Sequence, residues 1–250
     1  TTYSYRVSVD GVAGAEKTFT TVAATPLENG GLENWSQDGI QWNPWAADAT
    51  PFWGTGNKGS SIIGANITTP VDESVSGKAA LLASRYVVLK GLAAGNLFTG
   101  DFELKGMNGR ITMGRDFSSF PSGLRLYLKY QTSKITQADD AHQNLMGQND
   151  MCHIYFALTT EKVVIDTSLG DSFDQNASCV VAYGDFISSE NVSGNEKNNY
   201  KQIDIDLTYK RTNVTPKYII IVCSASRYGD FFTGGESSKL WIDEMELVYE

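Results

Sequence analysis

Two acidic residues near opposite ends of the chain lie where a carboxylate needs a partner. Asp243 falls in the apolar segment 240–249, and Glu33 lies two positions before Trp35. In a strand, side chains alternate between faces, so Asp243 would share a face with Trp241 and Met245. An unpaired buried carboxylate is costly. If the two ends of the domain pair, both acids could bind one cation.

A calcium ion fits these residues better than a transition metal does. Glu33, Asp243 and loop carbonyls near Asn29 offer hard oxygen ligands, and no His or Cys lies close in the sequence. The sequence therefore predicts a structural Ca²⁺ site. The alternative is that each carboxylate binds Lys, Arg or backbone amides.

A second group of residues suits carbohydrate. Tryptophans and polar residues alternate with Pro and Gly turns between positions 35 and 57, and an indole can stack on a sugar ring while amides bind its hydroxyls. Trp45 and Trp53 lie in turns, so we expect these two to be exposed. The predicted contacts are Trp42, Trp45, Trp53 and Asn57. The alternative is that the tryptophans close the edge of the fold.

The segment 224–235 follows the most apolar stretch of the chain and resembles a ligand-facing loop. Arg227 and Asp230 are its candidates for bonding sugar hydroxyls. They could equally pair with each other across a tight turn.

Signals for catalysis are weaker. Glycoside hydrolysis needs two carboxylates at a suitable separation, and Asp139, Asp140 and Asp150 surround a polar loop at 137–149 that could supply them. His153 alternates with Cys152 along a predicted strand, which excludes a Cys-His dyad there. The catalytic residues, if there are any, remain unknown from the sequence.

The elements that must position these residues are strands. Alternating or continuous apolar runs bounded by turns recur along the chain, whereas helical periodicity is nearly absent. The segment 218–223 has the composition of a strand buried on both faces. The pattern predicts an all-β fold, a jelly-roll β-sandwich of two antiparallel sheets. Strands are expected at 62–67, 79–89, 124–130, 151–159, 180–186, 203–207, 218–224 and 240–249.

The first 22 residues form a separate unit in this interpretation. Two alternating runs flank a Gly-containing turn, which predicts a β-hairpin over residues 1–22, a linker at 23–26 and the main domain at 27–250. The hairpin weakly resembles the last two strands of a fibronectin-type-III-like domain. Because a lone hairpin is marginally stable, we expect further domains upstream in the same protein.

Composition excludes several kinds of partner. The net charge of −9 argues against nucleic acid, which requires clustered Lys and Arg. No apolar run approaches the length of a membrane span. The three cysteines are widely spaced, so buried thiols are expected, with one disulfide as an alternative.

Several segments resemble the putative carbohydrate metabolism domain, a family found in exported proteins and lipoproteins of polysaccharide-degrading Gram-negative bacteria. The run Ala-Gly-Asn-Leu-Phe-Thr-Gly at 94–100 is the most specific of them, and the others lie at 30–35, 53–57, 128–130 and 224–249. The resemblance implies a jelly roll with a glycan-related role and no assigned catalytic residues. It also implies an exported protein at the outer-membrane surface or in the periplasm.

A looser similarity links the chain to galactose-binding-like carbohydrate-binding modules. Glu33 and Asp243 match the usual structural Ca²⁺ positions of those modules, although Leu32 replaces a Phe and Glu244 follows Asp243. We therefore expect a non-catalytic module that binds a poly- or oligosaccharide. The alternatives are a glycoside hydrolase acting through a carboxylate pair and a structural spacer module.

Overall fold

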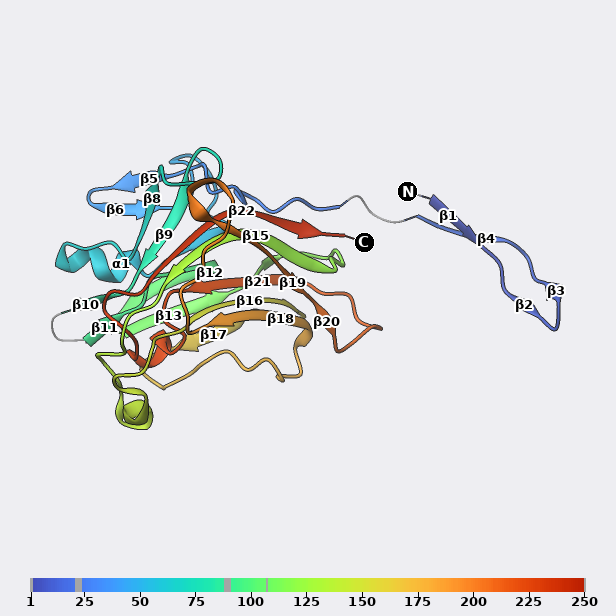
Figure 1. Ribbon diagram of the computed structural model, residues 1–250. Coiled ribbons are helices and arrows are strands. Elements are labelled where there is room, and N and C mark those ends of the chain that lie inside the picture. The colour runs from blue at the N-terminus through green and yellow to red at the C-terminus, as the bar shows by residue number, and fades with distance from the viewer. Residues whose placement is uncertain (1, 21–23, 88–90, 107, 250) are drawn as a thin grey trace.

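The computed structural model describes residues 2–20, 24–87, 91–106 and 108–249, and the chain folds into two packed antiparallel sheets with a hairpin at the N-terminal end (Figure 1). The predicted all-β jelly-roll sandwich is confirmed. The expected boundary between hairpin and linker, at 22–23, lies outside the described residues, as do the last residues of the strand expected at 79–89.

The larger sheet has nine strands. Its main path runs β17 (Val163–Asp166), β13 (Asn108–Met113), β12 (Asn96–Lys105), β21 (Tyr218–Ser224), β16 (Cys152–Thr159), β18 (Val180–Ser188) and β20 (Thr208–Tyr209). Two short strands attach beside this path, β14 (Arg115–Asp116) to β21 and β7 (Trp53–Gly54) to β12. The apolar segment expected to be buried on both faces is β21, in the middle of this sheet.

The smaller sheet has five strands and contains the end of the chain. Its order is β19 (Lys201–Asp206), β15 (Gly123–Gln131), β22 (Lys239–Val248), β9 (Ala79–Ala83) and β8 (Thr68–Val71). The main hydrophobic core lies between the sheets, where Leu124, Leu126 and Leu128 of β15 face Ile154 and Phe156 of β16. The alternation of β15 therefore places its leucines inward, as the sequence predicts.

One of the strands expected from the sequence does not form, and the structure contains several strands that the sequence did not predict. Residues 62–67 do not form a strand, because a short 3₁₀ helix (η1, Ser61–Ile63) continues helix α1 (Asn57–Ser60) and β8 begins only at Thr68. The prediction also lacks β12, the longest strand of the large sheet, whose run of Gly, Thr and Asp is not a regular apolar alternation. The remaining helical turns are η2 (Asp140–Leu145), η3 (Lys197–Asn199) and η4 (Gly229–Phe231).

The bulge in β22 changes the face of its residues. Glu244 has φ of 46°, and the pairing of β22 with β15 shifts at this point. Leu240 and Ile242 face the core before the bulge, and Met245 faces the core after it. The expectation that Asp243 and Met245 share a face is therefore wrong, because an extra residue in one strand reverses the alternation.

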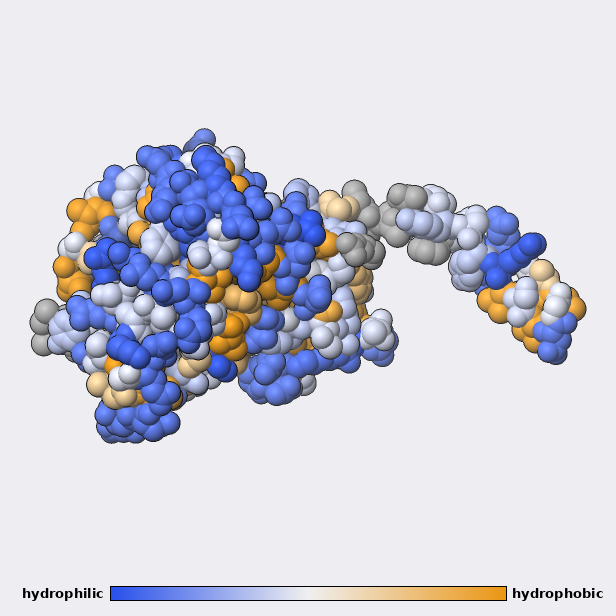
Figure 2. Space-filling model, viewed as in Figure 1, coloured by the Kyte–Doolittle hydropathy of each residue, from blue (hydrophilic) through white to orange (hydrophobic). Residues whose placement is uncertain are grey.

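The remaining strands form small hairpins, β5 (Ser36–Asp38) with β6 (Gln41–Asn43) and β10 (Arg85–Val87) with β11 (Gly91–Ala93). At the N-terminal end β1 (Thr2–Tyr5) pairs with β4 (Lys17–Thr20), and β2 (Ser8–Val9) pairs with β3 (Val12–Ala13). This N-terminal hairpin extends away from the sandwich (Figure 1). Hydrophobic residues gather on its far half (Figure 2), where Val7, Val9 and Val12 are exposed.

All three cysteines are free thiols. Cys152 and Cys223 are buried in the core, as expected, while Cys179 is half-buried.

Candidate functional site

The outer face of the large sheet carries a second hydrophobic cluster, separate from the core between the sheets. Strand alternation turns Tyr155 and Ala157 of β16 and Ile220 and Val222 of β21 outward. Phe98, Ile111, Met113 and Ile165 from the neighbouring strands complete the cluster. A sheet face with this much buried apolar surface must be covered by other segments, and these segments form a cavity.

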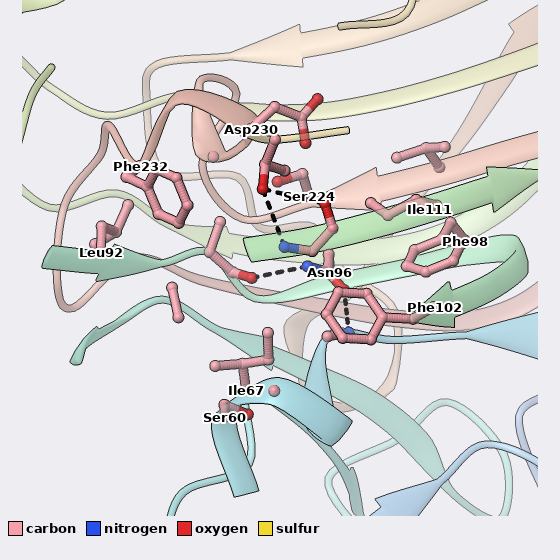
Figure 3. A pocket seen from close by; sticks show the side chains of 18 of the residues that line it. Ser60, Ile67, Leu92, Asn96, Phe98, Phe102, Ile111, Ser224, Asp230 and Phe232 are labelled. Carbon is pink, nitrogen blue, oxygen red and sulfur yellow. Dashed lines mark hydrogen bonds between the residues drawn. The ribbon is translucent and has the colours of Figure 1, made fainter. Parts of the chain in front are cut away.

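The cavity has a volume of about 180 Å³. Its floor is the outer face of β12, β13, β16 and β21, and its walls are helix α1, β11 and the segment 227–232 (Figure 3). Ser60 and Ile67 lie on one side of it, and Asp230 and Phe232 lie on the other. Segments distant in the sequence thus meet around one space.

The polar groups inside the cavity already have partners. The Asn96 side chain accepts a hydrogen bond from the Gly56 amide at 2.8 Å and donates one to the Ala94 carbonyl at 3.1 Å. The Ser224 hydroxyl donates to the Ser226 carbonyl at 2.8 Å. These side chains therefore hold the walls together and leave the interior apolar.

The rim is different, because two charged side chains there are unpaired. Within the described chain, neither the guanidinium of Arg227 nor the carboxyl group of Asp230 has a hydrogen bond or an ion pair, and Arg227 only lies over the Tyr228 ring at 5.4 Å. The expected alternative, a salt bridge between Arg227 and Asp230, is not formed. Both groups are free to bind a ligand.

A polar cluster lies beside Arg227 on the same sheet face. Tyr155 of β16 pairs directly with Asp185 of β18, and this register brings His153 Nε2 within 3.2 Å of the Asp185 carboxylate. The Tyr183 hydroxyl donates to the same carboxylate at 3.1 Å. The Tyr155 and Phe173 rings stack at 4.9 Å. The arrangement offers stacked rings, an imidazole and a carboxylate together.

Burial changes the pKa of two of these groups. Desolvation lowers the pKa of His153, although Asp185 partly offsets this, so the imidazole is mostly neutral near pH 7. Desolvation raises the pKa of Asp230 to about 6. The rim therefore loses a proton as the pH passes through 6.

The pKa of Asp230 predicts a dependence of stability on pH. The folded state holds the proton more tightly than the unfolded state, in which the pKa is near 3.8, so the free energy of unfolding should fall as the pH rises from 4 through 6. Asp243, whose pKa burial also raises to about 6, should act in the same direction. Urea unfolding of the wild type and Asp230→Asn at pH 4.5 and 7.5 tests this. The variant should lose less stability between the two pH values, and an equal loss in both proteins would contradict the assignment.

Two of the predicted sugar contacts are buried in the structure. Trp53 is 0% exposed and its indole N–H donates to the Glu28 carbonyl at 3.0 Å. Asn57 is also 0% exposed, and its amide bonds the backbone of Ile67 and Thr68. The expected exposure of Trp53 is wrong because its segment forms a short strand, β7, which pairs with β12 and places the indole in the core between the sheets.

Trp42 and Trp45 are half-buried and do not line the cavity. Trp42 lies on β6, and its carbonyl accepts a hydrogen bond from Asn57 at 2.8 Å. Of the six predicted sugar contacts, the structure therefore brings only Arg227 and Asp230 to the cavity.

The acid-rich loop at 137–149 packs against the 224–235 loop. The Asp139 amide donates to the Thr233 hydroxyl at 3.0 Å, and the Asp139 carboxylate binds the imidazole of His142. Asp140 is exposed. Asp150 is 1% exposed and accepts four hydrogen bonds, so it ties loops together and is shielded from any ligand at the surface.

The two end segments do meet, since the Met245 amide donates to the Gly30 carbonyl at 2.9 Å. Asp243 Oδ2 accepts from the Val75 and Ser76 amides at 2.6 and 3.2 Å, and Glu33 accepts from the Lys78 amide at 3.0 Å. These contacts match the alternative that each carboxylate binds backbone N–H groups, which donate hydrogen bonds and do not coordinate a cation. Among the described residues, no group of three or more His, Cys, Asp or Glu side chains is placed to hold a metal ion.

Asn29 also bonds the backbone nearby, because its side-chain amide donates to the carbonyls of Asn34 and Pro44, both at 3.1 Å. Calcium at Glu33, Asp243 and Asn29 stays a prediction. If Ca²⁺ binds there, the Tm of the domain should be lower in excess EDTA than in millimolar Ca²⁺, because a cation that binds only the folded state stabilises that state. An unchanged Tm, with Mg²⁺ as the control ion, would contradict it.

Sequence reasoning missed Tyr155, Tyr183 and Asp185. The alternation of β16 does place His153 and Tyr155 on one face, and that signal is visible in the sequence. The register that brings Asp185 beside them depends on the pairing of β16 with β18, which no local pattern reveals.

The fold and this site define the class of the protein: a β-sandwich domain with a ligand-sized cavity on the outer face of its larger sheet. A family model described as "Putative carbohydrate metabolism domain" matches residues 31–248, and the chain belongs to this family. No curated protein sequence matches the chain. Among the described helices, none is long and apolar enough to cross a membrane.

Two solved structures share the fold. One is a putative glycoside hydrolase from Bacteroides thetaiotaomicron, 21% identical, with a TM-score of 0.68 over 100% of this chain and 79% of its own. The other is a putative glycoside hydrolase from Bacteroides vulgatus, 22% identical, with a TM-score of 0.61 over 88% of this chain and 93% of its own. At these identities the likeness concerns the fold alone.

Proposed function

We propose that this domain binds an oligosaccharide on the outer face of its large sheet, without catalysing a reaction. The observation that carries the proposal is the pair of unpaired side chains at the rim, Arg227 and Asp230, on the same sheet face as the half-buried ring of Phe173, which stacks on the buried ring of Tyr155. Sugar recognition needs a ring on which a pyranose face can lie and charged groups that bind its hydroxyls. The negative net charge and the carbohydrate-related family are consistent with a neutral glycan.

A glycan array followed by calorimetric titration tests the proposal. Replacing Arg227 by Ala should weaken binding about 10-fold or more, because hydrogen bonds from a charged group contribute about 1.5–3 kcal/mol. Arg6→Ala, on the N-terminal hairpin, is the matched control and should bind like the wild type. Equal affinity of the Arg227 variant and the wild type would sink the proposed site.

A second candidate is glycoside hydrolysis, and one observation favours it. Two carboxyl groups in different surroundings lie near Tyr155. Asp185 forms hydrogen bonds with His153 and Tyr183. Burial raises the pKa of Asp230 to about 6, which suits a general acid. The solved relatives that carry the words "putative glycoside hydrolase" agree with this class. Release of reducing sugar from the same glycan panel, abolished by Asp230→Asn, would replace the binding proposal by this one.

The place of the domain in a larger protein is also part of the proposal. An exported polysaccharide-utilisation protein, at the outer-membrane surface or in the periplasm and anchored as a lipoprotein, would present the cavity to glycans at the cell surface or in the periplasm. The exposed valines of the N-terminal hairpin suit contact with a preceding domain. Protease accessibility on intact cells would test the location. The purely structural spacer remains the outcome if no glycan binds.

A further inference from the structure

The interior of the cavity and its rim differ in chemistry. Every wall of the interior contributes apolar side chains, among them Leu92 from β11, Phe98 and Phe102 from β12 and Ile111 from β13 (Figure 3). Two polar side chains that line the space, Asn96 and Ser224, form hydrogen bonds with the backbone. A sugar ring placed there would leave its hydroxyls without partners, which is costly.

The size of the interior fits one six-membered ring. The whole cavity, rim included, has a volume of about 180 Å³, and an engineered apolar cavity of roughly 150 Å³ in another protein stays dry and binds benzene. The cavity opens to solvent at its rim, and concave pockets lined mainly by apolar side chains with a few polar groups are the usual sites for small ligands.

The lining favours a flat ring over an alkyl chain. Phe98, Phe102, Tyr155 and Phe232 contribute aromatic side chains to the walls, and aromatic rings gain from edge-to-face and offset contacts with one another. The backbone of Phe232 has φ of 52°, in the left-handed region that a bulky residue rarely adopts. The 227–232 segment thus holds its ring at the cavity wall at a conformational cost.

We infer that the cavity binds an aromatic substituent of a glycan, an aryl group joined to the sugar through an ether, ester or glycosidic oxygen. The ring enters between β12 and the 227–232 segment, and the sugar stays at the rim with Arg227 and Asp230. This inference rests on the proposed glycan binding for the sugar half of the ligand, and on the cavity alone for the aromatic half.

The test uses benzyl alcohol as a probe of the cavity alone. Ligand-observed NMR and calorimetry should detect its binding to the wild type at millimolar concentration. Val222→Phe fills the cavity from the centre of β21, where Val222 is 8% exposed, and should abolish the binding. Val164→Phe, the control, replaces the same side chain on β17, where Val164 is 42% exposed and outside the cavity. This variant should bind benzyl alcohol like the wild type.

The second arm compares two glycosides of whichever sugar binds. The phenyl glycoside should bind about 10- to 100-fold more tightly than the methyl glycoside, the effect of burying one aromatic side chain. If Val222→Phe does not fold, Ala93→Leu fills the same cavity from its edge strand β11. The advantage of the phenyl glycoside should disappear in the filled variant.

The outcomes separate the two proposals. Glycan binding with no phenyl advantage and no binding of benzyl alcohol overturns the aromatic assignment and leaves the glycan site standing. Binding of benzyl alcohol that Val222→Phe abolishes, with no glycan bound at all, supports the cavity and refutes the proposed function. Binding of benzyl alcohol to wild type and Val222→Phe alike also overturns the assignment.

Discussion

Replacing Asp150 by alanine should destabilise the domain by about 3–5 kcal/mol, because it breaks a buried network in which four donors converge on one carboxyl group. Its Oδ2 accepts from the Ser226 and Ser238 hydroxyls at 2.6 and 2.8 Å and from the Gly235 amide at 2.7 Å. Its Oδ1 accepts from the Met151 amide at 2.8 Å. Without the carboxylate these donors stay buried and unpaired, at a cost of about 1–3 kcal/mol for each such group, not fully additive.

Urea unfolding of three variants measures this effect. Asp150→Asn should lose less than Asp150→Ala, because its amide oxygen can still accept two of the donors that converge on Oδ2. Asp140→Ala, on the exposed part of the same acid-rich loop, should change stability by less than about 0.5 kcal/mol. A loss below about 1 kcal/mol in Asp150→Ala would show that the carboxylate does not tie these loops together.

Trp53→Ala should have an effect of similar size, about 3–5 kcal/mol, through a different cause. The ring is fully buried, packs edge-on against Phe52 with centroids 5.4 Å apart, and donates to the Glu28 carbonyl at 3.0 Å. Its removal leaves a cavity in the main core and an unpaired carbonyl, so the loss exceeds the transfer free energy of the indole alone.

The control for Trp53 is another tryptophan of the same segment. Trp45→Ala should cost roughly half as much or less, because its half-buried side chain removes less area from water. Chemical denaturation followed by circular dichroism compares the two variants. Equal losses of stability in the two variants would contradict the difference in burial. If Trp53→Ala folds but no longer binds the glycan, Trp53 belongs to the binding site after all.

The fold could be predicted from the sequence because its central strands have strong patterns. β15 alternates leucines with polar residues and β21 is apolar throughout, which identifies one sheet with an exposed face and one buried strand. The bulge at Glu244 could not be predicted in this way. Its left-handed φ falls on a glutamate rather than on a glycine or asparagine, so no residue type marks it.

The site was harder to predict because its parts are distant in the sequence. Arg227 and Asp230 were found from a loop that follows a buried strand. Trp53 was misjudged because its turn-forming glycines also allow a short strand to pack closely on β12, where Gly54 lies opposite Phe98. The pairing of Tyr155 with Asp185 and the four donors to Asp150 depend on tertiary contacts.

The position of a bound oligosaccharide tests the central claim most directly. A crystal structure of the domain with the tightest glycan from the screen should show the sugar against Arg227 and Asp230, on the outer face of the large sheet. A sugar stacked instead on Trp42 or Trp45, away from that cavity, would contradict the account.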